Sequence, residues 1–232
     1  MTVPVPLDRA ERRPVLRAAI GIGLYAAAFG ASFGAVSVSS GLSLGQTMVL
    51  SLVMFSGASQ FAFAGVAAAG GSPFAAAAAA LLLGVRNGFY GLPLAEILQP
   101  RGWRRLGTAH LVIDETTAMA VGQPTRPLQR YAFWTTGIIL CVLWQVGTLI
   151  GSLAGAAIDP ATFGLDAAAP AVYLALLWPR LAGAAQRWVA VAGAGLALVL
   201  VPLVPQGVPV IAAASVAVLA GLLPRRTRTP EP

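Results

Sequence analysis

The sequence predicts an all-α polytopic membrane protein. Of its 232 residues, 57% are hydrophobic and only 10% are charged, and the mean hydropathy is +0.78. Soluble domains carry about 25% charged residues, so this composition excludes a soluble fold. The apolar runs are rich in Ala and Leu and lack strict apolar/polar alternation, which favours helices over an outer-membrane barrel.

The order of the apolar runs predicts about 6–8 helices in one transmembrane domain over residues 15–223. The first run, 15–38, is long enough to cross a bilayer core of roughly 30 Å. Its length and the runs that follow disfavour a cleaved signal peptide. Residues 1–14 and 224–232 are predicted to be cytoplasmic tails. The later runs are residues 46–69, 73–95, 108–122, 132–157, 170–179, 188–204 and 208–223.

The basic residues indicate topology and not nucleic-acid binding. The net charge is +7, all 15 basic residues are Arg, and all of them except Arg86 form short groups between apolar runs. Such groups mark cytoplasmic loops and attract anionic lipid headgroups, whereas nucleic-acid binding needs a basic face. Both termini are therefore predicted to be cytoplasmic, and the acidic loop 159–166 external. The groups are Arg9, Arg12, Arg13 and Arg17; Arg101, Arg104 and Arg105; Arg126 and Arg130; Arg180 and Arg187; and Arg225, Arg226 and Arg228.

One arginine group conflicts with a simple serpentine topology. If every run crossed the membrane, residues 101–105 would lie outside, contrary to the positive-inside rule. We therefore expect that one of the runs 46–69 and 73–95 does not cross completely. The run 108–122 is short for a span and is expected to be broken or re-entrant. Interrupted helices occur in membranes where they line a protein cavity.

Two pairs of glycines predict close helix packing. Gly30 and Gly34 lie in the first run, and Gly147 and Gly151 in the run 132–157. Small residues spaced by four let helix backbones approach closely. Each pair is followed by a Gly-Leu dipeptide, so the two halves of the chain are candidates for an internal repeat.

An acidic pair inside an apolar run is the strongest indication of function. Asp114 and Glu115 lie within 108–122, and ionisable groups at this depth usually face a path for an ion, a proton or a polar substrate. On one continuous helix, His110, Asp114 and Thr117 would share a face, so His110, Asp114 and Glu115 are candidates for proton coupling. The alternative places His110 at the membrane surface, near Arg105.

Two further segments carry candidate substrate-binding residues. The first interrupts an apolar helix with glycine and polar side chains, and free N–H groups at such a break attract a carboxylate; alternatively, these side chains bond to neighbouring helices. In the second, Arg86 can hold a carboxylate, pair with Asp114 or Glu115, or snorkel to the surface. The candidates are Phe55, Ser56, Gly57, Ser59, Gln60 and Phe61 in the first segment and Arg86, Asn87 and Tyr90 in the second, together with Asp114, Glu115 and Thr117.

Several classes of chemistry lack their motifs. The sequence has no His-x-x-x-His, no cysteine cluster and no Walker motif, so we expect no metal, no cofactor and no enzyme activity. The single cysteine, Cys141, is expected to be an apolar packing residue. Two other functions stay open, namely a channel or structural subunit and an intramembrane enzyme that uses Ser56 or Ser59 with His110.

Five segments in order resemble the AzlC family, the large subunit of branched-chain amino-acid permeases. The resemblance covers about residues 15–223 and implies an exporter of branched-chain or similar apolar amino acids in the bacterial cytoplasmic membrane. It also implies a small AzlD-type membrane subunit as partner. The chain departs from the family pattern at Ala28, Gly84 and Asn87, where many members have Pro, Asn and His. The segments are residues 29–35, 41–43, 54–61, 86–91 and 114–118.

Overall fold

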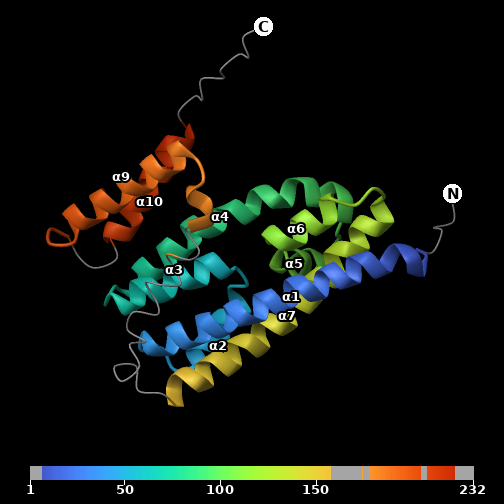
Figure 1. The fold of residues 1–232 in the computed structure, drawn as a ribbon, viewed down its shortest axis with the longest axis horizontal. Helices are drawn as coiled ribbons and strands as arrows, with labels where there is room; N and C mark the ends of the chain where they lie inside the picture. Colours follow the sequence, from blue (N-terminus) through green and yellow to red (C-terminus); the bar gives the residue numbers. More distant parts are fainter. Residues whose placement is uncertain (1–6, 158–173, 175–177, 205–207, 223–232) are drawn as a thin grey trace, which may run out of the picture.

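The computed structural model describes residues 7–157, 174, 178–204 and 208–222 (Figure 1). All regular elements in these ranges are helices and none is a strand, which confirms the predicted all-α class. The elements are α1 (Arg9–Ser39), α2 (Leu44–Val53), α3 (Gly57–Ala68), α4 (Pro73–Leu98), α5 (Arg104–His110), α6 (Asp114–Val121), α7 (Arg126–Ala157), the 3₁₀ helix η2 (Trp178–Leu181), α9 (Ala184–Leu200) and α10 (Val208–Leu222).

Among the described residues, three helices are long and apolar enough to cross a membrane: α1, α4 and α7. Helix α1 begins at Arg9, before the predicted apolar run, because Asp8 and Glu11 form a capping box at its start. Helices α1 and α7 lie side by side along the molecule and run in the same direction (Figure 1). Their N-terminal ends meet where Arg12 lies over the Tyr131 ring, 5.5 Å from its centroid.

The predicted glycine pairs form the contact between α1 and α7. A Cβ added at Gly30 would lie 2.6 Å from the Trp144 carbonyl oxygen. On the opposite side, a Cβ at Gly147 or Gly151 would collide with the backbone of Ala27 or Ala31. The two pairs therefore interdigitate, and a helix carrying larger side chains could not approach as closely.

The predicted run 46–69 is broken into α2 and α3. Residues 54–56 are not helical, and Ser56 has an extended backbone (φ −157°, ψ 98°). With 10 and 12 residues, the two helices are only about 15 and 18 Å long, too short to cross singly. Gly45 near the start of α2 and Ala67 at the end of α3 line one surface groove with Pro73 of α4. The pair therefore enters the molecule and returns to the same end.

The predicted run 108–122 is also broken, at residues 111–113 between α5 and α6. This second pair enters from the opposite, arginine-rich end. Arg130 at the start of α7 donates from Nε to the Ile97 carbonyl oxygen at 2.7 Å, which joins the beginning of α7 to the end of α4. The arginines at the starts of α1 and α7 and those after α4 thus lie at one end, and the conflict with the positive-inside rule disappears.

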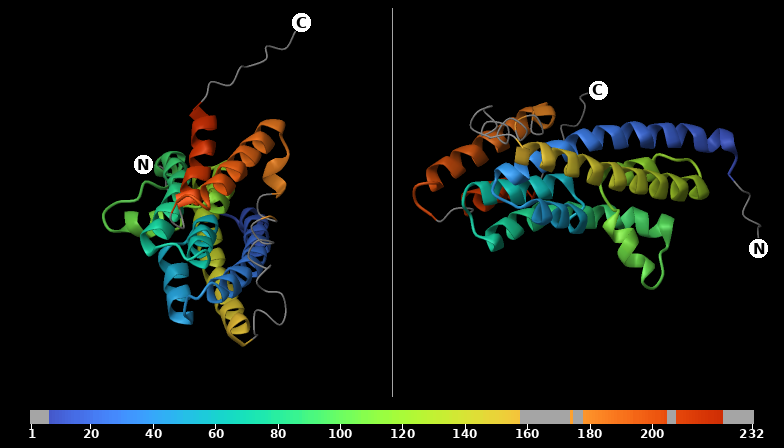
Figure 2. Two further views of the ribbon diagram at one scale, coloured as in Figure 1. Left: turned by 90° about the vertical axis from the view of Figure 1, so that its left-hand side faces the viewer. Right: turned by 90° about the horizontal axis from the view of Figure 1, so that it is seen from below.

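The C-terminal helices α9 and α10 form an antiparallel pair beside α4, at the end of the molecule away from the start of α1 (Figures 1 and 2). Helix α10 contacts α4, and η2 contacts α9. The predicted external loop 159–166 and most of the run 170–179 lie outside the described residues. The core of the molecule is the junction of α1, α3 and α7, where the rings of Phe33 and Phe61 meet edge to face at 5.6 Å.

Candidate functional site

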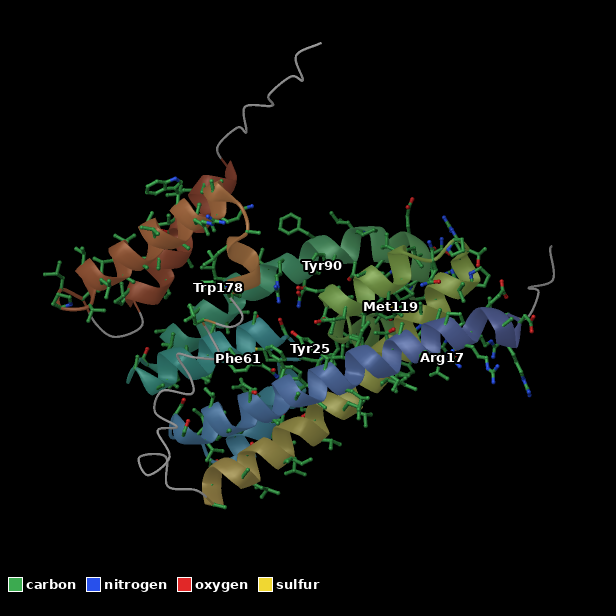
Figure 3. The ribbon with its side chains drawn as sticks, viewed as in Figure 1. Arg17, Tyr25, Phe61, Tyr90, Met119 and Trp178 are labelled. Carbon is green, nitrogen blue, oxygen red and sulfur yellow. The ribbon has the colours of Figure 1, made fainter. Side chains whose placement is uncertain are left out.

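A cavity of about 160 Å³ lies where the two helix breaks meet. Tyr25 and Phe61, labelled in Figure 3, belong to its wall. Tyr25 lies near the middle of α1 and Arg86 near the middle of α4, so the cavity lies about midway along two helices that are long enough to cross a membrane. The wall is formed by Tyr25, Ala26, Phe29, Phe55, Ser56, Gly57, Ala58, Phe61, Arg86, Ile113, Asp114, Glu115, Leu140 and Trp144.

An ion pair crosses the cavity between α4 and α6. Arg86 Nη1 lies 3.1 Å from Asp114 Oδ2, and the two side chains are 29% and 36% exposed. Of the three roles that the sequence left open for Arg86, the structure shows the pairing with Asp114. Arg86 Nε and Asp114 Oδ1 are buried and have no hydrogen-bond partner among the described residues. Both charged groups therefore retain polar atoms for a further ligand.

The N-terminal turn of α6 holds the carboxylates. Asp114 and Glu115 are its first two residues, where the positive end of the helix dipole stabilises negative charge. Thr116 fixes the turn: its Oγ1 accepts from the Ile113 N–H at 3.1 Å and donates to the Leu111 carbonyl oxygen at 2.6 Å. The break is thus stabilised by a side chain that replaces lost backbone bonds.

The N-terminal turn of α3 faces the same cavity without a carboxylate. Ser56, Gly57 and Ala58 line the cavity, and no side chain caps the helix start. The free N–H groups and the helix dipole there favour a negative ligand. A Cβ at Gly57 would lie 3.2 Å from Trp144 Cη2, so glycine keeps this entrance open.

Not every predicted residue reaches the cavity. Ser59, in the first turn of α3, does not line the cavity, and its Oγ lies 3.2 Å from Ser56 Oγ. Gln60 donates to the Ser51 carbonyl oxygen at 3.0 Å, and Thr117 donates to the Ile113 carbonyl oxygen at 2.7 Å. Gln60 thus bonds to the neighbouring helix α2, as the alternative interpretation expected, whereas Ser59 and Thr117 bond within or next to their own helices. The cavity wall includes neither Asn87 nor Tyr90, and Tyr90 packs against the hydrophobic core.

The predicted helical face shared by His110 and Asp114 does not exist. His110 is the last residue of α5 and Asp114 the first of α6, with three non-helical residues between them. The four-residue spacing therefore does not bring the two side chains together. Instead, the imidazole stacks on the Phe55 ring with 5.7 Å between centroids, which links the two breaks.

The sequence did not single out the wall residues on α1 and α7. Tyr25 and Phe29 are four apart on α1, and Leu140 and Trp144 are four apart on α7. Each pair lies on the helix that carries a glycine pair. Large side chains at helical spacing beside a predicted close contact are the signal that would have found them.

The cavity offers opposite charges, a free helix N-terminus and aromatic walls, which together suit a small molecule with an anionic end, a cationic end and an apolar body. Within the described residues, no group of three or more His, Cys, Asp or Glu side chains is placed to hold a metal ion. The fold and site define a helical membrane protein with a charged cavity between two broken helices.

Comparison with known proteins agrees with this class. The family model described as AzlC protein matches residues 21–158, and the chain belongs to the AzlC family. Two relatives, each described as an uncharacterized membrane protein, come from Helicobacter pylori strains ATCC 700392 / 26695 and J99 / ATCC 700824. Each is 26% identical over 149 residues, which cover 63% of this chain and 65% of the relative. No solved structure matches the chain.

Proposed function

We propose that this protein is a secondary transporter that exports branched-chain or similar apolar amino acids from the bacterial cytoplasm. The observation that carries the proposal is the cavity midway along α1 and α4, where Arg86 and Asp114 meet the free N-terminus of α3. Transporters commonly bind substrates near the bilayer midplane between broken helices, with a helix N-terminus directed at an anionic group. Membership of the AzlC family agrees with this function.

The substrate carboxylate binds at Gly57 and Arg86, and the ammonium group binds at Asp114 or Glu115. A zwitterion can be inserted into the Arg86–Asp114 pair without adding net charge, so its binding avoids burying an uncompensated ion. The side chain of the amino acid packs against Phe55 and Phe61. A cavity of 150 Å³ in another protein holds benzene, so about 160 Å³ suits a substrate of this scale and not a peptide.

The arginine-rich end is assigned to the cytoplasm, and both termini with it. The positive-inside rule supports this orientation because the arginines near the starts of α1 and α7 and after α4 gather at that end. A small AzlD-type membrane protein is the proposed partner, on the basis of the family alone. Inward and outward access alternates as the two broken pairs move against α1 and α7.

Counterflow in reconstituted vesicles tests the transport function. Vesicles loaded with unlabelled leucine should accumulate external radiolabelled leucine, with saturation at high concentration, when the protein is present with its proposed partner. Vesicles that contain the partner alone are the control. Flux that rises linearly with concentration would indicate a channel, and an absence of flux with and without the partner would contradict the proposal.

A further inference from the structure

A second cluster of polar side chains lies next to the cavity, around Ser51 in the last turn of α2. The Ser51 carbonyl oxygen accepts hydrogen bonds from Gln60 Nε2 at 3.0 Å and Gln145 Nε2 at 3.1 Å. Ser51 Oγ accepts from Trp144 Nε1 at 3.1 Å and lies 3.3 Å from Thr148 Oγ1. Ser51, Gln60 and Thr148 are completely buried, and Trp144 also forms part of the cavity wall. The cluster and the cavity therefore share a side chain.

The two glutamines in this cluster carry oxygens without donors. Gln60 Oε1 and Gln145 Oε1 are buried and have no hydrogen-bond partner among the described residues. Exchanging oxygen and nitrogen in either amide would place an oxygen against the Ser51 carbonyl, so a flipped amide does not resolve the shortage. A buried amide oxygen without a partner costs free energy. Two such amide oxygens, on side chains that both bond to the Ser51 carbonyl group, indicate a site for an electropositive ligand.

The helix geometry favours a cation at the same place. Helix α2 ends at Val53, so the negative end of its dipole and its last carbonyl groups are directed there. In transporters with broken helices, half-helix C-termini and unwound carbonyls coordinate Na⁺. The cluster contains only neutral oxygens, and a divalent ion would lose more hydration free energy than such ligands return. A monovalent cation is the ligand that this chemistry fits.

We propose that the cluster binds a monovalent cation, with Na⁺ as the ion to test, through Gln60 Oε1, Gln145 Oε1, Ser51 Oγ and Thr148 Oγ1. The bound ion fixes the last turn of α2 and, through Trp144, the wall of the cavity next to Gly57. The break between α2 and α3 then presents a cation site at one helix end and a carboxylate site at the other. This inference rests on the transport function proposed above, for which it names the coupling ion.

Ion binding is measured first on the purified protein. NaCl replaces choline chloride at constant ionic strength while the thermal unfolding midpoint and the tryptophan fluorescence are recorded. We expect both signals to change with Na⁺ and to saturate, because a ligand bound only by the folded state stabilises it by mass action. Equal curves in Na⁺ and choline, as expected if water alone fills the cluster, would overturn the proposal.

Variants then locate the site. Gln145→Leu and Thr148→Val each remove one proposed ligand, and we expect the apparent Na⁺ affinity to fall roughly tenfold to a hundredfold, the factor that corresponds to one hydrogen bond with a charged group. Gln129→Leu makes the same change on α7, where the side chain bonds to the Gln123 carbonyl oxygen instead, and should leave the affinity unchanged. Because the two variants change different positions, the test still holds if one of them fails to fold. Unchanged affinity in both would contradict the assignment.

Leucine counterflow separates this proposal from the transport function. If the bound ion holds the cavity wall in place, leucine binds more weakly in choline than in Na⁺. Leucine counterflow is then faster in Na⁺ than in choline, and this difference disappears in Gln145→Leu. Equal counterflow in the two salts would refute Na⁺ coupling while leaving transport intact. Saturable Na⁺ binding without counterflow in any salt would instead support the site and refute the transport function.

Discussion

The two broken helix pairs have the same construction and opposite chemistry. In α2–α3 and in α5–α6, a chain enters from one end, breaks for three residues and returns as a helix whose N-terminus faces the cavity. Helix α3 presents neutral Ser56 and Gly57 there, whereas α6 presents Asp114 and Glu115. The comparison shows that the N-terminus of a helix can either bind an anionic ligand or stabilise a carboxylate side chain of the protein itself.

In the proposed binding mode, the difference between the two helix starts distinguishes the two ends of the substrate. The uncapped turn of α3 is available for a carboxylate, and the acidic turn of α6 for an ammonium group. Arg86 lies between them and already pairs with Asp114 at 3.1 Å. Helix α7 contacts α2 of the first pair and α6 of the second, so one scaffold helix holds both halves of the site.

Removing the acidic half should have the largest effect. Asp114→Asn leaves Arg86 without its counter-charge and removes the proposed ammonium ligand, so we expect leucine counterflow to fall roughly a hundredfold. Asp8→Asn is the matched control, because Asn also caps helices well and Asp8 lies at the start of α1. If Asp114→Asn showed the same leucine counterflow as the wild-type protein, Asp114 on α6 would not be part of the binding site.

The ion pair can be separated from transport by a double variant. Arg86→Leu combined with Asp114→Leu removes both charges from the apolar interior. We expect the thermal midpoint to recover toward the wild-type value relative to either single change, because neither member of this ion pair is left without the other. Counterflow should stay lost in the double variant. A double variant that transports leucine would show that the pair serves stability only.

The scaffold that both pairs share should be the next most sensitive part. Gly34→Ala places a methyl group against the Thr148 carbonyl oxygen and 2.7 Å from the Ser152 nitrogen, so α1 and α7 must move apart. We expect a loss of about 1–3 kcal/mol in stability, as for other overpacked contacts. Gly21→Ala on the same helix has no atom within 4 Å of the added Cβ. Thermal unfolding in detergent that fails to distinguish the two variants would refute the close contact.

At the start of α3, the loss of a single backbone N–H group should weaken leucine binding. Proline is favoured at the first position of a helix and has no N–H, so Gly57→Pro removes one donor while keeping the start of α3. We expect the KM for leucine to rise roughly tenfold, as for a lost hydrogen bond to a charged group. Gly57→Ala adds a Cβ at the same place but keeps the N–H. The same KM in both variants would mean that the carboxylate binds elsewhere.

The histidine between the breaks should matter least. His110→Phe preserves a ring that can stack on Phe55 and removes the titratable group. Because the predicted pairing with Asp114 is absent, we expect a change of less than about twofold in counterflow and an unaltered pH profile. Loss of the pH dependence in this variant would restore His110 as a proton carrier.

The polar half of the site could be predicted from sequence, because charge and glycine are conspicuous in an apolar run. The break before Gly57 was anticipated on that basis, and the pairing of Arg86 with Asp114 was one of three roles left open for Arg86. The exact break between His110 and Asp114 was not, because residues 111–113 are Leu, Val and Ile, which do not signal an interruption. It depends on Thr116, whose hydroxyl bonds to backbone groups on both sides.

The apolar half of the site was not predictable in the same way. Tyr25 and Trp144 belong to runs in which lipid-facing and cavity-facing residues have similar composition. In water, burial separates such residues, but lipid is as apolar as the protein interior. Only the packing of α1 against α7 determines which of these side chains faces the cavity.

Equilibrium binding of labelled leucine to the purified protein tests the central claim most directly, with two truncated competitors. Isoamylamine keeps the ammonium group and the branched chain, and isocaproate keeps the carboxylate and the branched chain. If α3 and Arg86 bind one end and α6 the other, unlabelled leucine displaces the label and each competitor does so at least roughly tenfold more weakly. Displacement by either competitor as effectively as by leucine would contradict recognition of both ends.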